Sequence, residues 1–127
     1  MKAEVEIQLE KAREDLSDAK KLAAISMTKL AARSAYFAAF HAAEALIFEL
    51  GDKVVKTHSG VHTELARLLK DRADPRPLLP KFLAKTYKYK EISDYGGVRE
   101  VVTEAQMRDA IAGAQRFVEE IVDLLKG

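Results

Sequence analysis

One stretch of this sequence limits the possible folds more than any other: residues 30–50, which read LAARSAYFAAFHAAEALIFEL. The stretch is rich in alanine, the strongest helix former, and it is apolar on almost every side. A helix that is apolar all round must be surrounded by the rest of the protein, because a surface helix needs only one apolar stripe. The sequence therefore predicts a central, buried helix over about residues 28–50, ended by Gly51.

The two ends of the chain each carry a single apolar stripe. Apolar residues recur at alternating steps of four and three over residues 3–24 and again after Thr103, as an amphipathic helix requires. The stripes consist of Val5, Leu9, Ala12, Leu16, Ala19 and Ala23, and of Met107, Ile111, Ala114, Val118, Ile121 and Leu125. Thr103 and Gln106 fit a capping box, so we expect the last helix to begin there.

Two shorter helices are expected between these segments. A linker over residues 52–60 leads to a helix over about 61–70, with Thr57 or Ser59 as its cap. The proline-rich stretch DRADPRPLLP then breaks the chain, and a helix over about 78–95 ends at paired glycines. The sequence therefore predicts an all-α fold: a single domain over residues 1–127, built as an up-and-down bundle of four to five helices.

Composition excludes several classes of function. The net charge is +1, so no overall field draws the chain to nucleic acid, and any RNA contact must come from a local patch. There is no cysteine, which rules out disulfides, thiolate metal sites and a cysteine nucleophile. The charged amino terminus has no secretion signal, and no apolar run is long enough to span a membrane. We therefore expect a soluble, cytoplasmic protein without membrane contact.

Polar residues interrupt the apolar helix on one side. Arg33, Phe37, His41 and Glu44 fall within about 80° of arc at the 100° per residue of an α-helix. Charged and polar groups are costly to bury unless they find partners. Two interpretations remain open: a buried polar cluster that fixes the neighbouring helices, or a face that lines a cleft or a dimer seam.

His58 and His62 are four residues apart, a spacing that can bind a metal ion on a helix. A metal site needs a third ligand, and this stretch lacks the glutamate of a zinc-protease motif. We therefore favour a hydrogen-bonded start of the third helix around Thr57 and His58, and predict neither a metal nor another cofactor.

The stretch KYKEISDYGG, residues 88–97, combines charge with aromatic rings. Lys90 and Asp94 are four residues apart and share a helix face with Tyr87, with Glu91 beside them. A lysine can hold a phosphate by charge, and a carboxylate or a tyrosine can orient a proton. A lysine–aspartate pair at this spacing is also a common contact on a solvated surface, so spacing alone leaves both interpretations open.

Three blocks of the chain together resemble a known family. RSAYFAAFHAAEALIFELG (33–51), KTHSG (56–60) and the Asp-Tyr pair at 94–95 resemble the small stand-alone bacterial and archaeal members of the HEPN domain superfamily. The resemblance spans nearly the whole chain and implies a four- or five-helix bundle that is usually a homodimer. It also implies a metal-independent ribonuclease, often a toxin of a toxin–antitoxin pair whose partner is a minimal nucleotidyltransferase. That partner modifies a tyrosine near the motif in some pairs, which makes Tyr95, or else Tyr87 or Tyr89, a candidate.

The sequence departs from the usual catalytic motif of that family, an arginine followed closely by a histidine. Lys90 stands at the arginine position, and Asp94 stands where the histidine would serve, followed by Tyr95. The resemblance implies catalytic positions at these three residues. The candidate binding residues are Arg33, Tyr36, His41, Glu44, His58 and Tyr87.

Three functions are compatible with these features. The first is a HEPN partner of a nucleotidyltransferase that binds RNA or a nucleotide at a dimer cleft with a degenerate ribonuclease motif. The second is a working ribonuclease toxin that uses Lys90, Asp94 and Tyr95, or that recruits His41 across the bundle. The third is a dimeric scaffold whose polar clusters are architectural.

Overall fold

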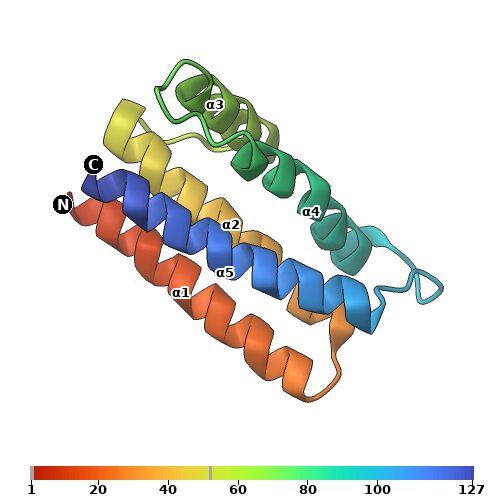
Figure 1. Ribbon diagram of the computed structural model, residues 1–127. Helices are drawn as coiled ribbons and strands as arrows, with labels where there is room; N and C mark the ends of the chain where they lie inside the picture. The colour runs from red at the N-terminus through yellow and green to blue at the C-terminus, as the bar shows by residue number, and fades with distance from the viewer. Residues whose placement is uncertain (1, 52) are drawn as a thin grey trace.

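The computed structural model describes residues 2–51 and 53–127; Met1 and Asp52, the first residue of the expected linker, lie outside the described residues. All regular structure in the described part of the chain is helical (Figure 1). The helices are α1 (Ala3–Ala24), α2 (Thr28–Gly51), α3 (His58–Lys70), α4 (Leu78–Tyr95) and α5 (Glu104–Lys126). The predicted all-α fold is therefore confirmed.

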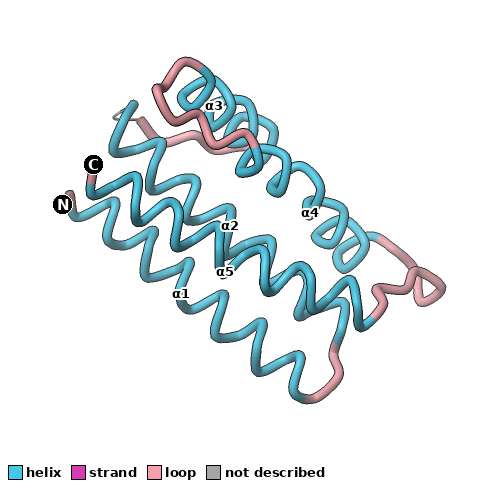
Figure 2. The backbone as a smooth tube through the Cα atoms, viewed as in Figure 1, coloured by secondary structure: helices cyan, strands magenta, loops and turns pink. Residues whose placement is uncertain are grey.

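The helices form an up-and-down bundle. Figure 2 shows α1 running in one direction and α2 returning beside it. α5 lies beside both helices and runs back toward the start of α1, so the two ends of the chain lie at the same end of the bundle. The shorter α3 and α4 cover the opposite side of α2 (Figure 1). α2 contacts each of the other four helices, which confirms the prediction that it is the central one.

Small side chains bring the helices close to α2. Eight of its alanines are fully buried: Ala31, Ala32, Ala35, Ala38, Ala39, Ala42, Ala43 and Ala45. Tyr36, Leu46 and Ile47 fill the spaces between the neighbouring backbones. Phe37 and Phe48 of the same helix are only half-buried. The face of α2 that carries Phe37 is therefore open in part, and it is the face on which the polar residues lie.

Local hydrogen bonds fix where the helices begin. Thr103 and Gln106 form the predicted capping box, with distances of 3.0 and 3.1 Å between backbone nitrogens and side-chain oxygens. At α3 the hydroxyl of Thr57 accepts a bond from the Gly60 amide at 3.0 Å. The sequence offered Thr57 or Ser59 as this cap, and because Thr57 serves, α3 begins at His58, earlier than expected. No helix in the described ranges is long and apolar enough to cross a membrane.

Candidate functional site

A strip of polar residues runs along the open face of α2, between α1 and α4. Arg33, Phe37, His41 and Glu44 follow one another at steps of four, four and three, so they share this face. The side chains of Arg33, His41 and Glu44 are 37%, 22% and 18% exposed. They are thus neither buried nor free, and each end of the strip is tied to a different neighbouring helix.

At one end of the strip, Arg33 and Lys90 meet at the same carboxylate. The Arg33 Nε donates to Oδ1 of Asp94 at 2.8 Å, and the Lys90 Nζ lies 3.5 Å from Oδ2. The guanidinium carbon of Arg33 lies 4.7 Å from the centroid of the Phe37 ring, which fixes its position further. The group joins α2 to α4 and brings together two cations that are far apart in sequence.

The charges of this group are stable at neutral pH. The hydrogen bond from Arg33 is the main reason why the pKa of Asp94 is lower than its usual value, and Lys90 contributes to the same effect. Partial desolvation lowers the pKa of Lys90, but Tyr95, Glu91 and the other neighbours outweigh it, so that this pKa is raised overall. Asp94 is therefore an ionised partner of two cations and a poor proton acceptor.

Two tyrosines flank the ammonium group of Lys90. Its Nζ lies 5.0 Å from the ring centroid of Tyr95 and 6.0 Å from that of Tyr87. Tyr95 is 76% exposed, so one aromatic ring is open to solvent beside the cations. A hydrogen bond with Glu91 is the largest cause that raises the pKa of Tyr87, so this phenol stays protonated. We refer to Arg33, Tyr87, Lys90, Asp94 and Tyr95 as the α2–α4 site.

Behind this site, a buried tyrosine holds two histidines. The Tyr36 hydroxyl lies 2.8 Å from Nδ1 of His58 and 2.9 Å from Nε2 of His62, and Tyr36 itself is fully buried. The ring of His58 packs on Phe40 with a centroid distance of 4.4 Å and lies 5.4 Å from the ring of Tyr87. The two histidines thus attach the start of α3 to α2, and His58 contacts the α2–α4 site.

Both histidines are neutral in this environment. Burial lowers the pKa of each, and the charge of Lys90 adds to the effect at His58. With two neutral imidazoles, the hydroxyl of Tyr36 donates to one ring nitrogen and accepts from the other. Among the described residues, no group of three histidine or acidic side chains has the arrangement needed to hold a metal ion.

At the other end of the strip, His41 contacts two carboxylates. Its Nδ1 lies 2.7 Å from Oε1 of Glu44, and its Nε2 lies 3.5 Å from Oδ2 of Asp15 on α1. Burial raises the pKa of Asp15 to about 6 against the attraction of His41. The Asp15 Oδ2 is buried without a hydrogen bond, because its contact with His41 lacks hydrogen-bond geometry. Asp15 could not be recognised from the sequence, where it looks like any other acidic residue of α1.

In a comparison with protein families, the model of the HEPN domain matches residues 5–125 of this chain. The chain belongs to the HEPN family. A search of curated proteins returned no match. The family assignment agrees with the bundle described above and with the resemblance found in the three sequence blocks.

This HEPN domain brings some of the expected site residues together and separates others. Arg33, Lys90 and Asp94 form one group, with Tyr87 and Tyr95 beside it. His41 and Glu44 lie toward α1, and their contacts in the described part of the chain do not reach Asp94.

Tyr36 is buried, so direct contact with a ligand does not fit its position, and its role is to hold His58 and His62. Lys29, one helical turn before Arg33 on α2, was not among the residues predicted from the sequence. Its Nζ donates a hydrogen bond to the Gly97 carbonyl oxygen at 3.3 Å. The signal for Lys29 was its spacing of four from Arg33.

Proposed function

We propose that this HEPN domain binds single-stranded RNA at the α2–α4 site, as a homodimer that pairs with a minimal nucleotidyltransferase in a toxin–antitoxin-type system. One observation carries the proposal: Arg33 and Lys90 reach the same point from two helices, next to the exposed ring of Tyr95. RNA-binding proteins hold single strands by pairing cations with phosphates and by stacking bases on aromatic rings.

The charge of the site favours an anionic ligand. Within the site, the two cations Arg33 and Lys90 face one carboxylate, Asp94, and Lys29 lies one helical turn from Arg33. Asp94 already occupies the position that a phosphate would take between Arg33 and Lys90. A bound phosphate must therefore displace Asp94 or share the cations with it, so that Asp94 limits the affinity of the site.

Binding is a better assignment than cleavage for this geometry. The lowered pKa of Asp94 makes its carboxylate a poor general base at neutral pH. Lys90, with a raised pKa, stays protonated and serves as a point charge without the paired hydrogen bonds of an arginine. Of the two residues that replace the usual catalytic pair of the family, Lys90 is therefore suited to hold a phosphate, and Asp94 is not suited to accept a proton.

A metal-independent ribonuclease is the second candidate, and His58 is the observation that favours it. Its imidazole is neutral, because burial and the charge of Lys90 lower its pKa, and its ring lies next to Tyr87. A neutral imidazole can accept the proton of a ribose 2′-hydroxyl. The nitrogen available for this purpose is Nε2, since Nδ1 is bonded to Tyr36.

Exposed apolar residues near the site support the homodimer. Ile25 and Met27 between α1 and α2, and Val98 and Val101 between α4 and α5, are 42% to 97% exposed. The bond from Lys29 to Gly97 brings these two connections together at one end of the bundle. A group of exposed apolar residues on one end is a surface that a second copy can cover. We call these four residues the apolar end.

The proposal is tested by the fluorescence anisotropy of a labelled single-stranded RNA. For Lys90→Gln we expect an affinity for RNA about fivefold to tenfold lower. Between about 50 and 200 mM salt, the slope of log affinity against log salt concentration should fall by roughly the contribution of one phosphate contact. Lys11→Gln is the matched control, an exposed lysine on α1. Equal affinity of Lys90→Gln and the wild type would rule out this site.

A parallel incubation separates binding from cleavage. Purified protein is mixed with a tRNA pool in EDTA, with wild type, Lys90→Ala, Asp94→Ala and His58→Ala side by side. We expect no cleavage by the wild type under conditions in which it binds RNA. Cleavage that persists in Asp94→Ala and disappears in His58→Ala would instead establish the ribonuclease with His58 as its base.

A further inference from the structure

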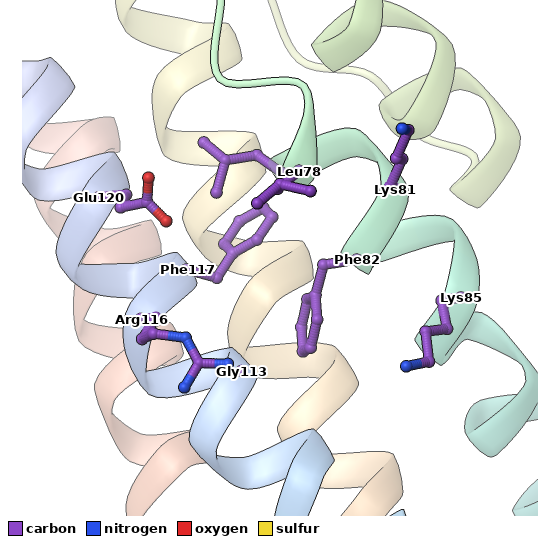
Figure 3. Close-up of a pocket in the computed structure, with 9 residues that line it drawn as sticks. Leu78, Lys81, Phe82, Lys85, Gly113, Arg116, Phe117 and Glu120 are labelled. Carbon is purple, nitrogen blue, oxygen red and sulfur yellow. The ribbon is translucent and has the colours of Figure 1, made fainter.

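A separate cleft lies between α4 and α5, away from the α2–α4 site. Its volume is about 270 Å³, and its inner surface is apolar, formed by Leu78, Leu79, Phe82 and Phe117. Figure 3 shows Phe82 from α4 and Phe117 from α5 beside this space, and their ring centroids are 5.9 Å apart. Leu78 is 72% exposed at the mouth, so a large apolar side chain faces solvent there.

Gly113, near the middle of α5, is one of the residues that line the cleft. A Cβ atom on Gly113 would lie 2.2 Å from Cε1 of Phe82, so only glycine allows the ring of Phe82 to pack directly on the backbone of α5. Glycine in the middle of a helix costs about 1 kcal/mol relative to alanine. Glycine at position 113 is thus unfavourable for α5 as an isolated helix, and the contact with Phe82 explains why it is present.

Three cations are among the residues that line the cleft: Lys81, Lys85 and Arg116. In the part of the chain that the structure describes, none of them forms an ion pair. Figure 3 shows Lys85 and Arg116 extending toward the space below Phe82 from opposite sides. Glu120 is the one carboxylate of the lining, and it lies 3.7 Å from Arg76, which reduces its effect on the cleft.

We propose that this cleft binds a small anionic amphiphile, a carboxylate attached to a short apolar chain. The apolar chain lies between Leu79, Phe82 and Phe117, and the carboxylate is held at the mouth by Lys85 and Arg116. The volume is near the lower end of the roughly 300–1,000 Å³ that is usual for small-molecule pockets, which fits a short chain. Arginine and lysine at a water-exposed rim are well suited to a carboxylate.

The floor of the cleft favours an alkyl chain over a nucleobase. Leucine and phenylalanine side chains offer no hydrogen bonds, so the ring nitrogens and exocyclic groups of a base would lose their water without compensation. An alkyl chain carries no such groups, and its binding becomes more favourable with every methylene group that it buries. The ligand class is therefore distinct from the RNA proposed for the α2–α4 site.

Isothermal titration calorimetry of the full chain with three ligands of equal chain length tests this proposal. The ligands are decanoate, decan-1-ol and decyltrimethylammonium, each below its aggregation concentration, with adenosine monophosphate as a fourth. We expect decanoate to bind one per chain and at least about fivefold more tightly than the alcohol, because only the carboxylate meets the rim cations. The quaternary ammonium ion should bind more weakly than the alcohol.

Variants locate the site. Lys85→Gln combined with Arg116→Gln should remove the preference for decanoate over decan-1-ol and leave the alcohol unchanged. Lys11→Gln combined with Arg13→Gln on α1 is the matched control, with the same charge change on exposed residues. Leu78→Asp, at an exposed position, places a like charge at the mouth and should weaken decanoate about tenfold. Thermal unfolding of each variant checks that the fold is intact.

Three results would overturn the proposal. The first is equal binding of the carboxylate and the quaternary ammonium ion, and the second is a rim variant with an unchanged decanoate preference. The third is tighter binding of adenosine monophosphate than of decanoate in competition at the same site. None of these results bears on RNA binding at Lys90, so the two proposals stand or fail separately.

Discussion

Arg33 of α2 donates a hydrogen bond from Nε to Oδ1 of Asp94 on α4, over 2.8 Å. This contact does two things at once. It attaches the C-terminal end of α4 to the central helix. It also pairs Arg33 with an internal carboxylate, and under the proposed function a phosphate would have to compete with that carboxylate for Arg33. The α2–α4 site is therefore a cationic site whose charge is partly neutralised by its own aspartate.

Replacing that aspartate should strengthen RNA binding. Asp94→Asn keeps the shape of the side chain but frees the charges of Arg33 and Lys90, so we expect RNA affinity to rise about fivefold at low salt and less at high salt. Anisotropy titrations at two salt concentrations measure the change. A catalytic or purely structural role of Asp94 predicts unchanged or weaker binding, and either result would contradict the prediction.

The histidine pair predicts loss of stability in mild acid. The pKa values of His58 and His62 are lowered in the folded state, so below the ordinary histidine pKa of about 6.5 the unfolded chain takes up protons before the folded one. Stability is therefore complete above this pH and falls as the pH is lowered toward the folded pKa values.

Urea unfolding at a series of pH values measures this effect. His62→Gln, which keeps a polar side chain toward Tyr36, should lose less stability than the wild type as the pH falls below about 6.5. The same slope in both proteins would show that the histidines do not contribute to it.

Asp15 should have the opposite pH dependence. Its pKa is raised to about 6 in the folded state, so the folded chain holds a proton that the unfolded chain releases, and stability is lost as the pH rises from about 4 to 6. Asp15→Asn removes this cost. We expect it to stabilise the protein at pH 7.5 by about 1 kcal/mol, less than the displacement of its pKa corresponds to because a quarter of the side chain is exposed.

The comparison is made by urea unfolding of Asp15→Asn and wild type at pH 7.5 and at pH 4. The gain should disappear at the lower pH, where the carboxyl group is protonated in the folded wild type as well. A variant that is less stable than wild type at pH 7.5 would show that the attraction between Asp15 and His41 outweighs the burial of the charge.

Gly60 should not tolerate a side chain. A Cβ atom there would lie 2.6 Å from Cγ1 of Val55 and 2.7 Å from Oγ1 of Thr57, the oxygen that caps α3. We expect Gly60→Ala to destabilise the protein by about 1–3 kcal/mol, through overpacking and loss of the cap. Gly97→Ala is the matched control, since its Cβ would have no neighbour within 4 Å. Equal midpoints for the two variants in urea would contradict the predicted contact.

The homodimer prediction rests on the apolar end. Light scattering at micromolar concentration should give a dimer for the wild type, and Val98→Asp should shift it to a monomer, because a charge would then be buried in the interface. Val98 is 97% exposed in the single chain, so the substitution leaves the fold unaffected. A wild-type monomer, or a dimer that Val98→Asp does not weaken, would exclude this surface.

Much of the fold could be predicted because helix formation is encoded locally. The apolar stripes of α1 and α5, the capping box at Thr103 and the glycines after α4 gave their positions closely. α3 was the exception, since two candidate caps preceded it and only the contact of Thr57 with Gly60 selects one. The alanine-rich composition of α2 was sufficient to identify it as the central helix.

The candidate site shows the limit of that reasoning. The spacing of Lys90 and Asp94 predicts their contact, because both lie on one helix whose period is fixed at 3.6 residues per turn. The bond from Arg33 to Asp94, the two histidines on Tyr36 and the contact of His41 with Asp15 each join different helices. The sequence by itself thus determined the helices and the residues that share a face. Only the tertiary structure decided which faces meet, because that depends on how the helices rotate and slide as they pack.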